Sequence, residues 1–518
     1  MFNIPTVIVA KTTLTSTASS VTLSYSAPSV SWTPRHLVVR VNGISSQNSE
    51  IKARFNGDSG TNYNRQMLRG QGTTPAALRV SGENGYLYGS LGTTLTTPSG
   101  GELLIPDALS TRSHKSLISL TGWQGEGEIT AFAGRWANTA AITSVTILPS
   151  AGILGVGTTI ELCVVDESYN INEQIKTAGT GTGTFAVSSI VADIGDLVVI
   201  GNLRSDIAQV GDEVFINLNS DDSSYPRQRL EGYGSTVGAS ASSLNDIGGS
   251  TAANATAGAF GAIVAQFPNY ANGDNDEIIS SFSGYHSSSS WSELRISTVR
   301  RNNVEAITAF TLDNQASGFI AGSMLSTYAV PKNLIERQEL SGTASSVTFS
   351  SIPQTYDHLE LSIYVRGDSS GQPEAGFKNE FNGDTTVANY KRQLIIASGT
   401  TVGAGQEAKN EPVDFPTSTA TANVFGSIAY SIQNYTKTDR HKHYMVTAGD
   451  AGENEIRITS NRWANTAAIS SIVFTPSAGN FIAGSVFVLS GINAPAAAAT
   501  SDVAALNGIA PADIEAVN

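Results

Sequence analysis

The sequence has a single cysteine, few charged residues and no long hydrophobic run. One cysteine cannot form a disulfide within the chain, which excludes a scaffold stabilised by internal disulfides. No apolar run approaches the roughly 20 residues that a transmembrane helix needs, so we do not expect membrane insertion. The sequence is also poor in the lysine, glutamate and leucine that build long helices, whereas it contains 50 glycines. This composition favours short strands joined by many turns.

Charged residues make up 14% of the 518 positions, and acidic residues dominate, giving a net charge of −14. An acidic surface repels phosphate backbones, so nucleic acid is not an expected partner. The charge is instead suited to keeping a protein soluble at high local density. The single cysteine, Cys163, lies in the apolar stretch 160–165 without a basic neighbour that would activate its thiol. We therefore expect it to be buried and inert.

One stretch of nine residues occurs twice with almost no change, at 134–142 and at 461–469. A degenerate third copy lies midway between them, where Arg301 replaces the repeated tryptophan. Internal repeats of this quality indicate tandem structural units. The sequence therefore predicts three domains, at residues 1–168, 169–332 and 333–493, followed by an alanine-rich tail at 494–518.

The apolar residues within each unit follow the period of a β-strand. Residues 359–366 alternate apolar and polar side chains, which predicts a strand with one buried and one solvated face. Asn-Gly pairs at 56–57 and 382–383 predict type I′ hairpin turns, whereas Asn219-Ser220 lacks the glycine and should turn less tightly. Because no helical period is sustained, we expect an all-β protein of three tandem antiparallel β-sandwiches. The sandwiches should be jelly-roll-like in plan, with a short C-terminal tail.

The repeated Arg-Trp motif has two interpretations. An exposed tryptophan could stack on a sugar ring, or the tryptophans could fill the cores of the sandwiches. We favour the second interpretation, because a residue shared by repeats usually belongs to the scaffold. Arg301 in the middle copy suggests a position near a rim, which keeps the first interpretation open. The candidate ligand or interface residues of this motif are Trp136, Trp463, Arg135, Arg300 and Arg462.

A second motif, Tyr-x-Arg-Gln, occurs in all three units and places Arg65, Arg227 and Arg392 at the same position. A threefold ring of arginines could bind a carboxylate of a ligand. A salt bridge or a Tyr–Arg stack within each unit is the favoured alternative.

Metal and catalytic motifs are absent from the sequence. His441 and His443 have the spacing of metal ligands, but no cysteine or carboxylate joins them at the spacing of a zinc site. The acidic loop at 272–277 could offer oxygen ligands to calcium, but it lacks the EF-hand pattern. We found no nucleophile elbow, glycosidase carboxylate pair, phosphate-binding glycine loop or zincin helix. The sequence therefore predicts no enzyme, no cofactor and no metal.

Three stretches of the third unit resemble a module of tailed-bacteriophage virion proteins. They are residues 351–359, residues 381–390 and residues 462–481. The resemblance is weaker in the first unit and faint in the second. It implies a non-enzymatic structural protein, exposed on the particle as part of a tail or fibre assembly, and it supplies no catalytic residues. It also implies a location in the virion, assembled in the host cytoplasm, with other tail, portal-proximal or capsid proteins as partners.

Two further functions remain open. Three fused sandwiches could mimic a trimer and occupy a threefold-like position, as a head-decorating protein that stabilises the capsid does. Alternatively, the divergent loops rich in glycine, serine and threonine could bind carbohydrate on the host surface. The protein could also form a homo-oligomer.

The tail at 494–518 contains an eleven-residue repeat and resembles short repeats at the ends of phage structural proteins. It is too short to bury a core, so we expect a disordered end or a peptide that docks on a neighbour. The candidate docking residues are Leu506, Asn507, Ile509, Ile514 and Val517.

Overall fold

The computed structural model describes residues 4–492, except for residues 29, 98, 126, 178–182, 192–194, 222–224, 272, 274–275, 289–290, 315–317, 331–333 and 451–453. The candidate docking tail lies outside the described residues. The described part contains strands β1 to β36, two short 3-10 helices and no α-helix. None of its helices is long and apolar enough to span a membrane.

Within the described residues, each third of the chain forms twelve strands. The first domain contains β1 (Thr6–Thr13), β2 (Val21–Ser24), β3 (Leu37–Gly43), β4 (Ser49–Phe55), β5 (Tyr63–Gln71), β6 (Thr74–Glu83), β7 (Tyr86–Leu91), β8 (Ser99–Ile105), β9 (Lys115–Trp123), β10 (Glu128–Trp136), β11 (Ser144–Pro149) and β12 (Thr159–Val165). The second contains η1 (Glu167–Tyr169), β13 (Asn170–Ile175), β14 (Phe185–Val187), β15 (Asp196–Leu203), β16 (Gly211–Leu218), β17 (Arg227–Tyr233), β18 (Thr236–Ser242), β19 (Asp246–Thr251), β20 (Gly261–Phe267), β21 (Glu277–Ser288), β22 (Trp291–Arg301), β23 (Phe310–Asp313) and β24 (Met324–Val330). The third contains β25 (Leu334–Glu339), β26 (Val347–Phe349), β27 (His358–Val365), β28 (Glu374–Phe381), η2 (Val387–Asn389), β29 (Tyr390–Ser398), β30 (Thr401–Glu407), β31 (Val413–Pro416), β32 (Gly426–Gln433), β33 (Lys442–Asp450), β34 (Glu455–Trp463), β35 (Ile472–Pro476) and β36 (Val486–Ile492).

All three domains have the same sheet topology. In the first domain, an eight-stranded sheet has the order β1-β12-β3-β8-β9-β10-β5-β6, and a four-stranded sheet has the order β2-β11-β4-β7. The other two domains repeat both orders strand for strand, and the paired strands are antiparallel. Because the chain crosses repeatedly between two facing sheets, each domain is a jelly-roll-like sandwich. The predicted fold class is confirmed.

Each sandwich encloses its own hydrophobic core, and β27 shows how the strands form it. Leu359, Leu361 and Ile363 point into the third core and are fully buried, as the alternation predicts. The intervening Glu360 and Ser362 are buried as well, with 6% and 4% of their surface exposed. The expectation of a solvated face was therefore wrong, because this face of the sheet packs against the other two domains, with Glu360 near Arg40 and Ser362 bonded to Asp196.

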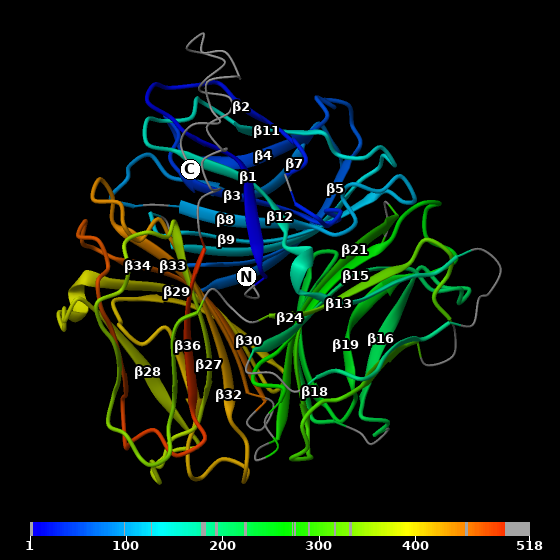
Figure 1. Cartoon of the computed structure of the whole chain (residues 1–518). Helices are drawn as coiled ribbons and strands as arrows, with labels where there is room; N and C mark the ends of the chain where they lie inside the picture. The colour runs from blue at the N-terminus through cyan, green and yellow to red at the C-terminus, as the bar shows by residue number, and fades with distance from the viewer. Residues whose placement is uncertain are drawn as a thin grey trace, which may run out of the picture.

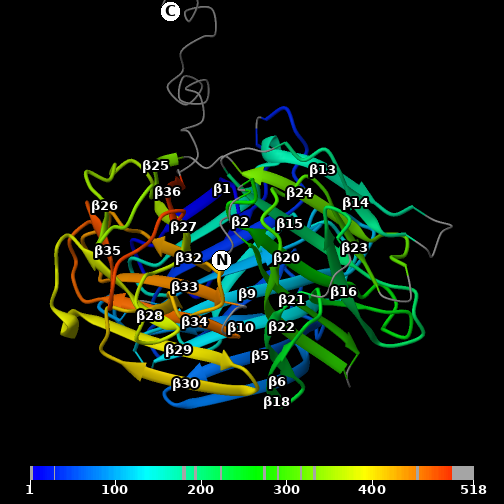
Figure 2. The same cartoon turned by 90° about the horizontal axis from the view of Figure 1, so that it is seen from below.

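The three eight-stranded sheets face one another around a common centre (Figures 1 and 2). Figure 1 shows the first domain in blue and cyan, the second in green and the third in yellow to red, as three lobes around this centre. One apolar cluster joins all three domains, and it includes Ile129, Leu294 and Ile458 from β10, β22 and β34. The same strands of each domain also meet at the centre, since β6, β18 and β30 contact one another, as do β5, β17 and β29. The single chain is thus a pseudo-trimer.

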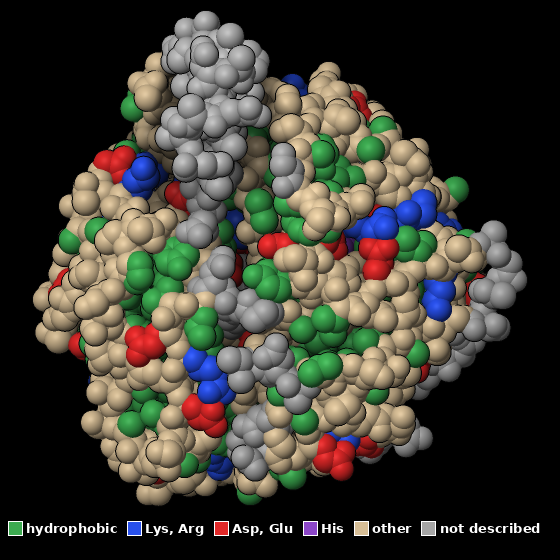
Figure 3. Space-filling view, viewed as in Figure 1, with side chains coloured by type: hydrophobic (Ala, Val, Ile, Leu, Met, Phe, Trp, Pro, Cys, Tyr) green, Lys and Arg blue, Asp and Glu red, His purple; other side chains and the backbone are tan. Residues whose placement is uncertain are grey.

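Cys163 belongs to this shared cluster and is fully buried, as predicted. Burial raises the pKa of its thiol to about 12, although Arg40 lies 3.4 Å away and favours the thiolate. Figure 3 shows the acidic and basic side chains of one face scattered in small groups among neutral ones.

Candidate functional site

The two repeated tryptophans lie in the hydrophobic cores of the first and third domains. Trp136 and Trp463 end β10 and β34, and both side chains are 0% exposed. Their indole Nε1 groups donate hydrogen bonds to Asp58 (2.7 Å) and Asp384 (2.8 Å). Each acceptor is the aspartate that follows an Asn-Gly turn, so the two repeated motifs bind each other. In this structure neither tryptophan offers a face on which a sugar could stack.

Arg301 takes the place of the tryptophan in the second domain. It is only 1% exposed, so the expectation of a position near a rim was wrong. Its Nε donates to Asp221 (3.1 Å), so the hydrogen bond of the indole is retained. The residue opposite it on the next strand is Glu277, whereas Lys115 and Lys442 stand opposite the tryptophans. The change to arginine is therefore accompanied by a change from lysine to glutamate. Burial still raises the pKa of Glu277 well above its usual range, although Arg301 opposes this shift.

The turn asparagines tie each hairpin to the loop after the Arg-Trp motif. Asn56 accepts hydrogen bonds from the backbone of residues 143 and 144 and donates one to Ala141, and Asn219 and Asn382 repeat this pattern. Both central residues of each turn have positive φ, as a type I′ turn requires. The expected looser turn in the second domain was wrong, since Ser220 adopts a φ of 63° and keeps the same geometry.

The Tyr-x-Arg-Gln motif serves the fold through each of its three fixed residues. The hydroxyl of Tyr63 accepts a hydrogen bond from Phe55 N (3.0 Å) and donates one to Asp58 O (3.1 Å), which braces the turn. Tyr225 and Tyr390 do the same in their domains. The arginines form ion pairs inside their own domains and not a common ring. The pairs are Arg65 with Glu50 and Glu83, Arg227 with Asp246, and Arg392 with Glu407.

The glutamines of the same motif connect the domains in a closed cycle. Gln66 Nε2 donates to the carbonyl oxygen of Gly234 in the second domain (2.9 Å). Gln228 Nε2 donates to Gly399 O in the third domain (2.9 Å), and Gln393 Nε2 returns to Gly72 O in the first (3.0 Å). Each acceptor glycine has a φ of 54° or 55° at the tip of the hairpin next to the common centre. We missed this role in the sequence, although the invariance of the glutamine in three units was visible there.

The arginines of the Arg-Trp motif lie where neighbouring domains meet. Arg462 Nη1 donates to Thr96 O of the first domain (3.1 Å). Arg300 pairs with Asp276 (2.9 Å), whose carbonyl oxygen accepts a hydrogen bond from a tyrosine of the third domain. Arg135 lies close enough to His286 of the second domain to help lower its pKa, after the larger effect of burial. The described part of the loop at 272–277 thus takes part in an ion pair, while Asp274 lies outside the described residues.

The contact between the first and third domains contains a buried charged cluster. His358 Nδ1 accepts a hydrogen bond from Asn434 N, so its Nε2 carries the proton that points at Glu161, 2.6 Å away. Lys11 also contacts Glu161 (3.0 Å) and reaches Asp357 (2.5 Å) of the third domain. Burial alone would raise the pKa of Glu161, but His358, Lys11 and Arg40 lower it to about 2.

A repeated glutamate marks a further position that we missed in the sequence. Glu128, Glu293 and Glu455 occupy the same place, opposite the last residue of β5, β17 and β29. Each lies seven residues before the arginine of the Arg-Trp motif, which was the signal available in the sequence. Their surroundings differ. Glu128 accepts hydrogen bonds from Ser90 and Thr130, whereas Glu293 accepts one from Tyr285 and pairs with Arg295, and Glu455 pairs with Arg457.

In the third domain this position belongs to a carboxylate cluster. Ligand oxygens of Glu374, Asp414 and Glu455 lie within 4.8 Å of one another, and no other such group was found among the described residues. Burial and the neighbouring carboxylates raise the pKa of Glu374 to about 8. Arg457 lies 2.5 Å from Asp414 and also pairs with Glu455, so a cation of the protein already occupies this cluster. Within the part of the chain that the structure describes, His441 and His443 belong to no such group.

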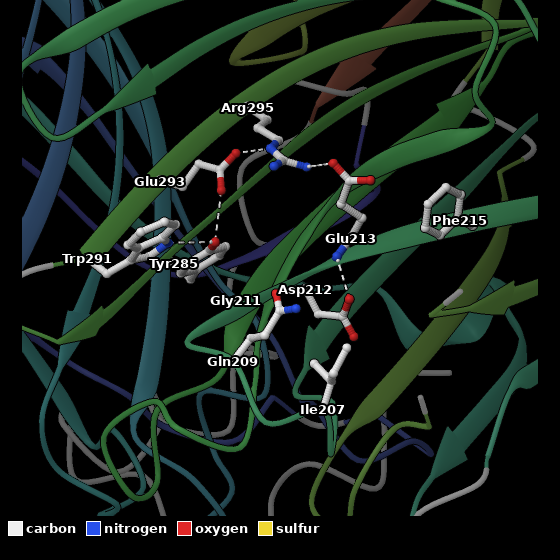
Figure 4. Close-up of a pocket in the computed structure, with 10 residues that line it drawn as sticks. All are labelled: Ile207, Gln209, Gly211, Asp212, Glu213, Phe215, Tyr285, Trp291, Glu293 and Arg295. Atoms are coloured by element: carbon white, nitrogen blue, oxygen red, sulfur yellow. Dashed lines mark hydrogen bonds and ion pairs between the residues drawn. The ribbon is translucent and has the colours of Figure 1, made fainter. Parts of the chain in front are cut away.

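In the second domain the repeated glutamate is Glu293, which borders a cavity of about 360 Å³ (Figure 4). The lining residues are Ile207, Gln209, Gly211, Asp212, Glu213, Phe215, Tyr285, Trp291, Glu293 and Arg295. A chain of contacts runs from Trp291 through Tyr285, Glu293 and Arg295 to Glu213 (Figure 4). A larger cavity of about 540 Å³ lies in the first domain beside residues 25–35 and 107–112, where Arg35 and Arg112 are paired with Glu173 and Asp107.

Comparisons with known proteins identify no family for this chain. No protein-family model matches it, and no curated protein does either. Among solved structures, it was aligned with the LG1-3 region of the laminin alpha2 chain over 92% of this chain and 96% of that one, at 9% identity and a TM-score of 0.15. It was also aligned with the triple jelly roll protein of the turret assembly in an archaeal virus, over 92% of this chain and 83% of that one, at 9% identity and a TM-score of 0.13. Scores this low carry no argument about function.

Proposed function

We propose that this chain is a non-enzymatic structural protein of a tailed-bacteriophage particle, exposed on its surface as part of a tail or fibre assembly. The observation that carries the proposal is the closed pseudo-trimer, with its cycle of Gln66, Gln228 and Gln393 hydrogen bonds and its shared apolar cluster. A chain with internal threefold symmetry presents three equivalent faces, which suits a partner built on a threefold axis. The resemblance of the third unit to a phage virion module supports the same assignment.

A second candidate is a head-decorating protein at a threefold-like site of the capsid lattice. The three domains cluster around one centre and do not follow one another in a line (Figure 1). Such a shape also suits a plug on a lattice. In either position, the partners would be other virion proteins, with host-surface carbohydrate as a further possibility.

The test is a reconstruction of purified particles in which this chain is located in the density. Three lobes around a threefold or pseudo-threefold axis of the tail or a fibre support the first candidate, and the same lobes on the capsid lattice support the second. Particles without any density for the chain, and without its peptides by mass spectrometry, would refute both. A variant that lacks residues 494–518 should fold but fail to enter particles, because we propose that this tail docks on a neighbour. Normal incorporation of the variant would exclude a docking role.

A further inference from the structure

We propose that the cavity of the second domain is a saccharide-binding site, which accepts a neutral or amine-bearing sugar and rejects acidic sugars. This inference goes beyond the structural role and rests on other residues. The residues that carry it are Trp291, Tyr285, Glu293, Asp212 and Gln209.

Tyr285 borders the cavity, and its side chain fits there because two glycines of the facing sheet carry no Cβ. A Cβ on Gly211 would lie 2.1 Å from the Tyr285 hydroxyl oxygen, and a Cβ on Gly249 would lie 3.0 Å from its ring. The strand registers place Glu374 and Asp414 of the third domain at the same two positions. Their carboxylates lie close to Glu455, the counterpart of Glu293 in the third domain. In the second domain the Tyr285 side chain lies against these two positions instead, and the cavity beside it has the size of a small-ligand site.

The aromatic wall of the cavity is held in a fixed orientation. Trp291 is partly exposed, and its ring packs edge-to-face on Tyr233 with the centroids 4.7 Å apart. Its Nε1 donates to the Tyr285 hydroxyl (3.2 Å), which donates in turn to Glu293 (2.8 Å). A tryptophan fixed in this way presents apolar surface without loss of side-chain entropy on binding. The apolar CH face of a sugar ring is a suitable partner, since its opposite edges carry hydroxyl groups for the polar wall.

The polar wall supplies both acceptors and donors. Arg295 pairs with Glu293 and approaches Glu213 (3.4 Å), so these side chains are ordered before a ligand arrives (Figure 4). Carboxylate oxygens accept hydrogen bonds from hydroxyls, while the guanidinium and the exposed amide of Gln209 donate them. Convergent polar groups beside an aromatic wall are the usual composition of a site for a polar small molecule.

The local charge decides which sugars fit. The lining contains three carboxylates, Asp212, Glu213 and Glu293, against one cation, Arg295. Behind the lining, Arg227 and Arg229 pair with Asp246 and Glu231, and Arg229 also lies 3.5 Å from Glu213. Over the whole cluster five carboxylates face three guanidinium groups, so negative charge remains in excess. A uronic or sialic acid would be repelled, whereas a hydroxyl or an ammonium group would be attracted.

The test uses the purified full chain and free monosaccharides, namely galactose, glucose, mannose, N-acetylglucosamine, glucosamine and glucuronic acid. Saturation-transfer NMR and calorimetry should show saturable, millimolar binding of at least one neutral or amino sugar, and weaker or no binding of glucuronic acid. Trp291→Ala should weaken the binding at least about tenfold, because it removes the stacking surface. Glu128→Gln changes the same glutamate position in the first domain and serves as the matched control, which should bind as the parent does.

Gly249→Asp is a second variant, which introduces the residue of the third domain. Its side chain would collide with the Tyr285 ring and should displace the aromatic wall of the cavity. Both pocket variants must keep the thermal unfolding midpoint of the parent within a few degrees for their binding to be compared. The proposal is overturned if no sugar of the panel saturates, if both variants bind as well as the parent, or if glucuronic acid binds best. None of these results depends on where the chain lies in a particle, so failure here leaves the structural role untouched.

Discussion

The cycle of glutamine-to-glycine hydrogen bonds makes a quantitative prediction about the pseudo-trimer. Replacing Gln393 by alanine removes the donor to Gly72 O in another domain and leaves that carbonyl without this partner. An intramolecular hydrogen bond contributes about 0.5–1.5 kcal/mol, and a buried group left unpaired costs about 1–3 kcal/mol. Since the glycine acceptors are only partly buried, we expect a loss of about 1–2 kcal/mol for Gln393→Ala.

Gln66 should be more sensitive than Gln393. Its Nε2 donates to Gly234 O, and its Oε1 also accepts a hydrogen bond from the buried Ser292 of the second domain (2.6 Å). Gln66→Ala leaves both partners unpaired, so we expect a loss of about 2–3 kcal/mol in the free energy of unfolding.

The assay is denaturant unfolding together with hydrogen exchange at the three hairpin tips. The triple alanine variant of the three glutamines should shift the midpoint by about the sum of the single changes, because each bond joins a different pair of domains. Exchange near Gly72, Gly234 and Gly399 should become faster before the rest of the sheets opens. Gln372→Ala, at an exposed position, is the control. If the triple variant is no less stable than this control, the cycle does not hold the domains together.

Three further predictions follow from single contacts. Ser220→Gly should stabilise the protein by about 0.5–1 kcal/mol in thermal unfolding, because glycine adopts a φ of 63° without strain; no gain would show that this turn stores no strain. The pKa of Glu161 is lowered from 4.5 to about 2 on folding, so its stabilisation of about 3 kcal/mol is present above pH 4.5 and is lost as the pH falls towards 2. Unfolding measured against pH should show this slope in the parent and lose it in Glu161→Gln. Trp463→Arg should lower the free energy of unfolding by about 3–5 kcal/mol, and adding Lys442→Glu, as in the second domain, should recover at least about 1 kcal/mol of it. A double-mutant cycle by denaturant unfolding would measure this coupling energy. A coupling energy of zero would contradict the idea that the two changes of charge compensate each other.

The local structure was readable from the sequence because its determinants lie close together in the chain. The Asn-Gly turns and the alternating strands depend on a few neighbouring residues, and the structure has them where the sequence indicates. The burial of the polar face of β27 could not be predicted in the same way. The sequence predicts that Glu360 and Ser362 are solvated, but the other two domains cover them, and no local pattern reveals what packs on a sheet from outside.

The candidate sites were harder to predict, because they depend on pairs of residues far apart in the chain. Trp136 and Asp58 are both in repeated motifs, yet only the fold shows that one binds the other. Tyr285 borders the cavity of the second domain and packs against Gly211 and Gly249, a contact that is known only once the strand register is known. In a chain with 50 glycines, neither stands out by itself.

The second domain keeps the residues that join it to its neighbours and changes those that fill its interior. Gln228 and Tyr225 retain their roles, while the tryptophan has become Arg301 and a cavity borders Tyr285. Both changes weaken the packing of a single sandwich, because a buried arginine needs partners and a cavity forfeits contacts. Packing against two other domains buries further apolar surface on its eight-stranded sheet and offsets that loss. A pseudo-trimer in one chain can therefore vary one of its three units independently, which a homotrimer cannot do, and this freedom is what a single asymmetric binding site requires.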